Sequence, residues 1–89
     1  MKKVLTVCGL GQGTSLILKM NVEQALADND YQADVENTDL SAASSMNADY
    51  IFTSNEIAES LKEHSAKVII INSFFDMEEI NEAIQQNVD

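Results

Sequence analysis

The chain has 89 residues, of which 45% are hydrophobic, and its 15 acidic and five basic residues give a formal net charge of −10. Nucleic-acid binding needs clustered cations, so this charge argues against it, and the lone cysteine excludes an internal disulfide. No stretch approaches the roughly 20 apolar residues of a membrane span, and no signal-type segment opens the sequence. We therefore expect one cytoplasmic domain over residues 1–89, with no direct membrane insertion.

Four short apolar runs, at residues 3–7, 34–36 with their neighbours, 50–53 and 67–71, alternate with segments of helical pattern. This alternation predicts an α/β fold with a parallel sheet. Right-handed crossovers then favour a three-layer open sheet of four parallel strands in the order 2-1-3-4, flavodoxin-like or Rossmann-like. Residues 68–71 are continuously apolar and β-branched, which is typical of a strand covered on both faces.

Three helices have clear sequence signals. The first is expected to begin near Gly13 or Thr14. The spacing of a capping box predicts the start of a second helix, with Thr53 three residues before Glu56, and of a last helix, with Asp76 three residues before Glu79. The segment 40–47 is compatible with either a short helix or an irregular crossover.

The cysteine of the chain, Cys8, directly follows the first apolar run and opens a glycine-rich stretch that leads into the first helix. Ligands of open α/β sheets bind at the carboxyl ends of the strands, near the switch in strand order. The stretch contains all three glycines of the protein, and it consists of Gly9, Leu10, Gly11, Gln12, Gly13, Thr14 and Ser15. Backbone freedom is thus concentrated beside a single thiol.

A loop that enters a helix amino terminus points several backbone N–H groups inward, and the helix adds a partial charge of about +0.5. This arrangement binds oxyanions and favours a thiolate. Thr14 and Ser15 can add hydroxyl donors. We therefore predict that Cys8 is a nucleophile that carries a phosphoryl group, held by residues 9–15. The alternative is a buried structural cysteine.

Three other anion-binding loops have similar sequences. A dinucleotide-binding loop, with Glu36 as the ribose carboxylate, would need its third glycine one position later than Gly13, and a nucleotide P-loop would need a lysine. A cysteine phosphatase normally closes its loop with an arginine, where this chain has Thr14 and contains no arginine at all. Because the loop has no fixed cation and no obvious general acid, it favours passing the phosphoryl group on over hydrolysing it. The alternatives that stay open are a small cysteine-dependent phosphatase or arsenate reductase, and a non-enzymatic flavin- or nucleotide-binding module.

The segment 7–20, which reads VCGLGQGTSLILKM, resembles the active-site segment of the enzyme IIB components of the bacterial phosphoenolpyruvate-dependent sugar phosphotransferase system, in particular of the ascorbate-type branch. The resemblance implies that Cys8 accepts a phosphoryl group from a phosphohistidine of a IIA partner. Cys8 would then transfer it to a sugar-like substrate bound to a membrane IIC transporter. It implies a phosphotransferase subunit that acts only with its partners, in the cytoplasm, at the inner face of the membrane through IIC.

Residues 18, 22, 25 and 26 share one face of the first helix, whereas Leu16 and Met20 fall nearly opposite. We predict that Leu16 and Met20 form a docking patch for IIA or IIC, although isolated exposed apolar residues are ordinary. His64 is expected to be solvated and distant from Cys8. Phe74 and Phe75 follow the fourth strand, and they either line the edge of the sheet at which Cys8 lies or cover the core. The sequence contains no cluster of Cys and His residues that would indicate a metal site, and we expect no cofactor.

Overall fold

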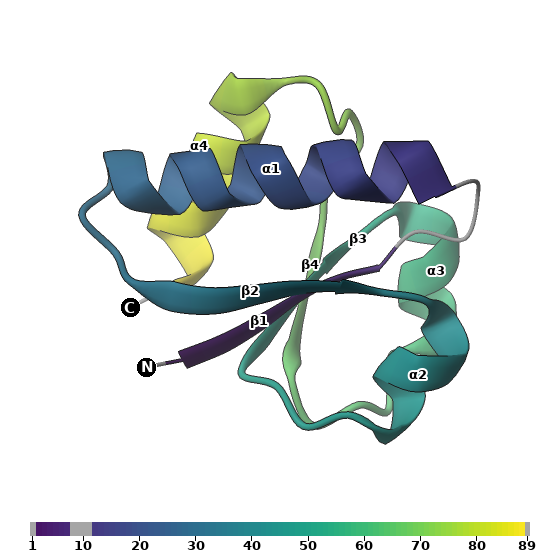
Figure 1. The fold of residues 1–89 in the computed structure, drawn as a ribbon. Helices are drawn as coiled ribbons and strands as arrows, with labels where there is room; N and C mark the ends of the chain where they lie inside the picture. Colours follow the sequence, from purple (N-terminus) through teal and green to yellow (C-terminus); the bar gives the residue numbers. More distant parts are fainter. Residues whose placement is uncertain (1, 8–11, 89) are drawn as a thin grey trace.

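The computed structural model describes residues 2–7 and 12–88. Strands and helices alternate along the described chain (Figure 1). The elements are β1 (Lys2–Val7), α1 (Gln12–Asp28), β2 (Ala33–Thr38), α2 (Leu40–Ser45), β3 (Tyr50–Thr53), α3 (Asn55–Ser60), β4 (Lys67–Ile70) and α4 (Met77–Asn87). The predicted alternation is confirmed, and the segment after Asp39 forms a short helix.

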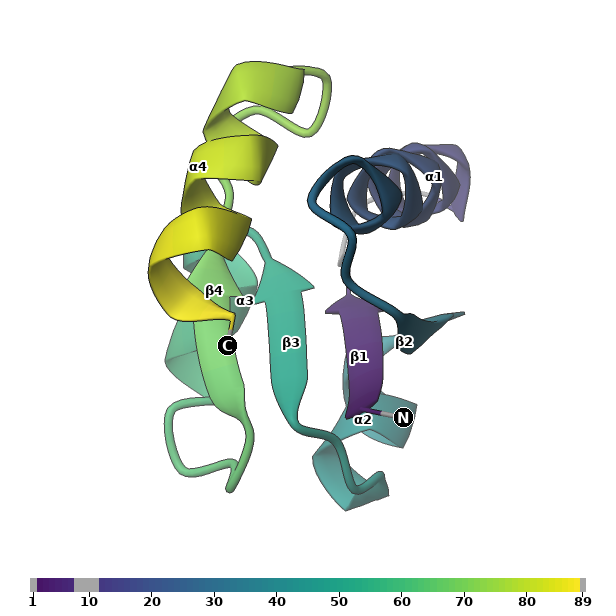
Figure 2. The same ribbon diagram turned by 90° about the vertical axis from the view of Figure 1, so that its left-hand side faces the viewer.

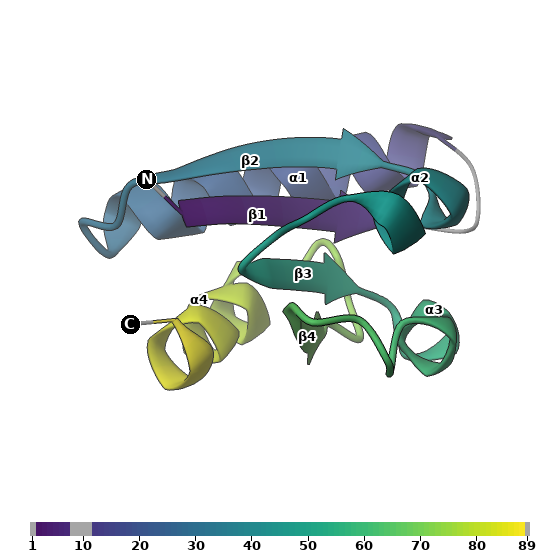
Figure 3. The ribbon, with the colours of Figure 1, turned by 90° about the horizontal axis from the view of Figure 1, so that it is seen from below.

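The four strands form one parallel sheet in the order β2-β1-β3-β4, as predicted. At the end of β1, Val7 lies between Thr38 of β2 and Thr53 of β3, and Thr53 in turn pairs with Ile70 of β4. The strands β1, β2 and β3 run in the same direction in Figure 3. Their carboxyl ends therefore meet at one edge of the sheet.

Helices cover both faces of the sheet, with α1 and α4 on one face and α2 and α3 on the other (Figures 1 and 2). Each face has its own hydrophobic cluster, because side chains alternate along a strand. The cluster beneath α1 and α4 includes Leu18, Val22, Ala25, Leu26, Phe52, Ile69, Ile80 and Ile84. The cluster beneath α2 and α3 consists of Leu5, Val7, Ala43, Ile51, Leu61 and Ala66.

The edge strand β4 is covered less completely than its sequence suggests. Ile69 and Ile71 are buried beneath α1 and α4, but Val68 is only half-buried and Ile70 is 44% exposed. The prediction that this strand is covered on both faces is therefore wrong. The helix on its other side, α3, has only six residues, and no described strand lies beyond β4.

The two predicted capping boxes have different outcomes. Asp76 caps α4 as predicted, because its side chain accepts hydrogen bonds from the N–H groups of Glu78 and Glu79 at 3.1 and 3.2 Å. Thr53 does not cap α3. The capping position is Ser54, whose side chain makes no capping hydrogen bond, and Thr53 remains the last residue of β3.

None of the helices in the described part of the chain is both long enough and apolar enough to cross a membrane.

Candidate active site

The carboxyl end of β1 lies at the switch in strand order. From β1 the chain passes through α1 to β2 on one side, and then returns through α2 to β3 on the other side. Ligands of open α/β sheets bind at this position. Cys8 directly follows Val7, the last residue of β1. Cys8, Gly9, Leu10 and Gly11 themselves lie outside the described residues.

A buried hydrogen bond fixes the end of β1. The Thr53 hydroxyl donates to the Val7 carbonyl oxygen at 2.8 Å, and neither residue is exposed to solvent. That carbonyl belongs to the peptide that joins Val7 to Cys8. Thr53 therefore positions the peptide that leads into the glycine-rich stretch. This contact was not predicted, because Thr53 also has the spacing of a helix cap. The position of Thr53 at the end of a buried strand was the available signal.

The helix α1 begins at Gln12, slightly earlier than predicted, so that Gln12, Gly13, Thr14 and Ser15 form its first turn. The described side chains of this helix begin at Leu16. The 17 residues of α1 place a partial positive charge at its amino terminus, and its first turn contains no acidic residue. This end of α1 is therefore electrostatically suited to an anion.

The lysines in the described residues lie mostly away from this edge. Lys2, Lys3 and Lys67 stand at the beginnings of strands, at the opposite edge of the sheet. Lys62 follows α3 and lies 3.7 Å from Glu59, and Lys19 is in the second turn of α1. A phosphoryl group at the carboxyl end of β1 would thus depend chiefly on backbone amides and hydroxyls.

Glu36 does not lie where a ribose-binding carboxylate belongs. It pairs with Leu5 in the middle of the sheet, not beyond the end of β2, and its carboxylate lies 3.6 Å from the Lys3 ammonium group. The same ammonium group lies 3.2 Å from Asp34. The dinucleotide-binding interpretation therefore has no support from the position of Glu36.

His64 was expected to be solvated, but it is half-buried and both of its ring nitrogens contact backbone groups. Its Nδ1 accepts a hydrogen bond from the Ala66 N–H at 2.9 Å, so its Nε2 carries the proton and faces the carbonyl oxygens of Ala43 and Met46 at 3.0 and 2.9 Å. The prediction is wrong because the ring ties the end of α2 to the connection between α3 and β4. That connection leads to the beginning of β4, so His64 is distant from the end of β1, as expected.

The two phenylalanines have different environments. Phe74 belongs to the core, with 8% of its surface exposed, and its carbonyl oxygen accepts a hydrogen bond from the Asn21 amide at 2.7 Å. Phe75 is 68% exposed. On α1, Leu16 and Met20 are 50% and 60% exposed, on the side opposite the core, as their positions on the helix predict. Within residues 2–7 and 12–88, no group of three His, Cys, Asp or Glu residues is arranged to hold a metal ion.

Comparisons with known proteins agree with this geometry. The family model described as "PTS system, Lactose/Cellobiose specific IIB subunit" matches residues 3–86. The ascorbate-specific PTS system EIIB component of Mycoplasma pneumoniae is 28% identical over 86 residues, which cover 93% of this chain and 90% of that protein.

A solved structure shares the fold. It is the lactose-specific IIB component domain of the phosphoenolpyruvate:carbohydrate phosphotransferase system from Streptococcus pneumoniae. It has a TM-score of 0.66 and 15% sequence identity, and the match covers 96% of this chain and 92% of that one. Because the family model spans nearly the whole sequence, the chain belongs to the family of lactose/cellobiose-type IIB subunits of the phosphotransferase system.

Proposed function

We propose that this IIB subunit carries a phosphoryl group on Cys8, which it accepts from a phosphohistidine of a IIA protein and gives to a sugar-like substrate bound to a membrane IIC transporter. The observation that carries the proposal is the end of β1. This end lies at the switch in strand order, and the Thr53 hydroxyl holds the peptide that precedes Cys8 by a hydrogen bond. The amino terminus of α1 follows within a few residues. In this role residues 1–89 act as one phosphocarrier domain in the cytoplasm, held at the inner face of the membrane through IIC.

The transfer consists of two displacements at phosphorus. In the first, the Cys8 thiolate attacks the phosphorus of a phosphohistidine whose other ring nitrogen is protonated. An S–P bond forms, the N–P bond breaks, and the IIA histidine leaves as a neutral imidazole that keeps that proton. In the second, a substrate hydroxyl attacks, an O–P bond forms, the S–P bond breaks and the thiolate is regenerated. The hydroxyl proton passes to a base of the IIC site. Residues 9–15 stabilise the phosphoryl oxygens through backbone N–H groups and the hydroxyls of Thr14 and Ser15.

The composition of the site favours a carrier over a phosphatase. Rapid hydrolysis needs a group that activates water and usually a fixed cation on the phosphoryl oxygens. The chain contains no arginine, and three of its five lysines lie at the amino ends of strands. The phosphocysteine should therefore survive until a partner arrives.

Leu16 and Met20 are the proposed docking patch for IIA or IIC. Both are at least half exposed, and they lie on successive turns of α1 directly after the active loop. The variant with Leu16→Ser and Met20→Ser should slow phosphoryl transfer from IIA or to the IIC-bound substrate. Ala27→Ser, an exposed apolar-to-serine change at the far end of the same helix, is the matched control. Unchanged transfer rates in both directions would reject the patch.

The proposed function is tested by mapping the phosphoryl group. The protein is incubated with phosphoenolpyruvate, the general phosphotransfer proteins and a IIA partner, and the product is analysed by mass spectrometry of intact protein and peptides. We expect one phosphoryl group on Cys8, none on Cys8→Ser, and an unaltered reaction in His64→Ala. Turnover of an aryl phosphate by the isolated protein would instead favour the cysteine phosphatase.

A further inference from the structure

The two edge strands of the sheet have different chemical character. On β2, Asp34 and Glu36 lie beside Lys3, and charged side chains on an edge discourage another strand from pairing with it. On β4, Val68, Ile69 and Ile70 follow one another, and the only charged residue is Lys67 at the beginning of the strand. The edge at β4 is therefore open to pairing.

Backbone groups of β4 point outward from the sheet. Lys67 and Ile71 donate hydrogen bonds toward β3, to the carbonyl oxygens of Asp49 and Thr53 at 3.1 and 2.9 Å. In a parallel ladder, the N–H and C=O groups of every second residue face the same neighbouring strand. The N–H and C=O groups of Val68 and Ile70 therefore face away from β3, where a fifth strand would bind.

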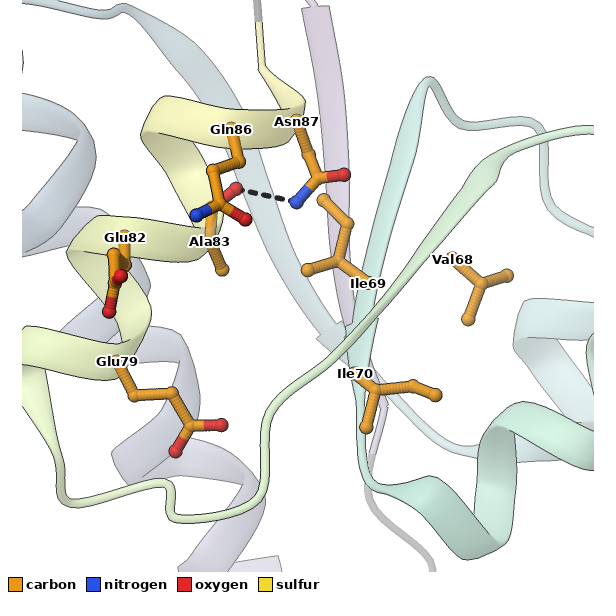
Figure 4. A pocket seen from close by; sticks show the side chains of 8 residues that line it. All are labelled: Val68, Ile69, Ile70, Glu79, Glu82, Ala83, Gln86 and Asn87. Atoms are coloured by element: carbon orange, nitrogen blue, oxygen red, sulfur yellow. Dashed lines mark hydrogen bonds between the residues drawn. The ribbon is translucent and has the colours of Figure 1, made fainter.

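A groove of about 350 Å³ runs between this edge and α4. Figure 4 shows Ile69 pointing toward α4, whereas Val68 and Ile70 point to the other side of the strand. Glu79 and Glu82 line the helix side, and none of the described residues that line the groove is basic. Glu79 already accepts hydrogen bonds from the N–H groups of Asn72 and Ser73 at 2.7 and 3.0 Å, while Glu82 is exposed. The groove therefore offers negative charge on its helix side and apolar surface on the strand.

We propose that β4 accepts an extended segment of a partner protein that carries Lys or Arg at alternate positions, and that this segment adds to the sheet as a fifth strand. Its backbone pairs with Val68 and Ile70. Its basic side chains face Glu82 on the α4 side, and the intervening apolar side chains cover Ile70 on the other side. This mode of recognition uses main-chain hydrogen bonds for affinity and alternate side chains for specificity.

A basic partner fits this edge better than a second copy of the chain. Each copy carries a net charge of −10, so two copies repel each other, whereas a basic segment is attracted. Cytoplasmic loops of membrane proteins carry an excess of Lys and Arg. The membrane partner is therefore the first place to seek the segment, and this one identification rests on the proposed function.

The test uses a short synthetic peptide that alternates Lys and Val, with a control peptide in which Glu replaces Lys. NMR spectra of the isotope-labelled full-length protein should show shifts of the Val68 and Ile70 amide resonances, and slower hydrogen exchange of both amides, with the Lys peptide only. Glu82→Lys should weaken binding about five- to tenfold, because attraction becomes repulsion. Glu59→Lys, on α3 with 82% of its side chain exposed, is the matched control and should bind as the unmodified protein does.

A backbone variant tests the strand pairing itself. Ile70→Pro removes an outward N–H without removing a bond to β3, so it should abolish binding while edge-strand proline remains tolerated in the fold. Equal binding of both peptides, shifts confined to β2, or no binding would overturn the proposal. Self-association of the protein through β4, seen by light scattering, would assign the edge to a second copy instead. Cys8→Ser should bind the peptide as the unmodified protein does, because the peptide binds at β4. The test of strand pairing therefore stays valid even if Cys8 carries no phosphoryl group.

Discussion

Replacing Thr53 by valine removes one buried hydroxyl and leaves the shape of the side chain almost unchanged. The hydroxyl donates to the Val7 carbonyl oxygen at 2.8 Å in a region that solvent does not reach. Loss of such a bond costs about 1 kcal/mol, and an unsatisfied buried carbonyl adds to this, so Thr53→Val should lower the free energy of unfolding by about 1 to 2 kcal/mol. With a urea m-value of about 1 kcal/mol/M for a domain of this size, the midpoint of unfolding should fall by about 1 to 2 M.

Thr6→Val is the matched control for this prediction. Thr6 is equally buried, but its hydroxyl lies 3.5 Å from the Asn37 side-chain oxygen, near the limit of a hydrogen bond. Its replacement should cost clearly less than that of Thr53. If Thr53 also positions the peptide that leads to Cys8, Thr53→Val should slow phosphorylation by about tenfold or more at temperatures where the protein stays folded. Equal unfolding midpoints for the two variants and unchanged phosphorylation would refute the reasoning.

Three further predictions concern residues away from the carboxyl end of β1. His64→Ala should lower the free energy of unfolding by about 1 to 2 kcal/mol, and nitrogen NMR should find the proton of the unmodified ring on Nε2, because Nδ1 accepts from Ala66; a proton on Nδ1 would contradict this. Asp30 has a φ of 57° at the end of α1, so Asp30→Gly should stabilise the protein by about 0.5 to 1 kcal/mol in urea unfolding, and no gain would argue against strain there. Desolvation by burial, and then the neighbouring Tyr50, raise the pKa of Tyr31 above its ordinary value of 10.0. Its contribution to stability should therefore be complete below pH 10 and be lost as the pH rises through that higher pKa; an NMR titration that found Tyr31 ionising at or below its midpoint in the unfolded chain would contradict this.

The parts of the fold that local patterns specify were predictable. Strand order followed from the alternation of apolar runs with helices and from the handedness of crossovers. The helix face formed by Leu18 and Val22 followed from the period of an α-helix, and so did the exposure of Leu16 and Met20.

The errors arose where a residue had two local interpretations and a distant contact decided between them. Thr53 has the spacing of a cap, but Val7, 46 positions earlier, provides its partner. His64 looked solvated because its acceptors, Ala43 and Met46, belong to another helix. Such pairings become visible only in the folded sheet.

The phosphoryl-carrying role of residues 8–15 was predicted from chemistry and family resemblance. The strand that precedes Cys8 ends at the switch in strand order, and the helix that follows has no acidic residue in its first turn. The predicted roles of Cys8 and of Gly9, Leu10 and Gly11 lie outside the described residues and stay predictions. The roles of the Gln12, Thr14 and Ser15 side chains likewise stay predictions.

The most direct test of a carrier is to follow one labelled phosphoryl group. The protein is phosphorylated with radiolabelled phosphoenolpyruvate through the general phosphotransfer proteins and its IIA partner, separated from the donors, and divided into two portions. With unlabelled IIA, or with IIC membranes and substrate, the label should leave Cys8 and reappear intact on the partner histidine or the substrate. In the other portion, without partners, it should stay on the protein. Release of the label as inorganic phosphate at the same rate in both portions would contradict the account.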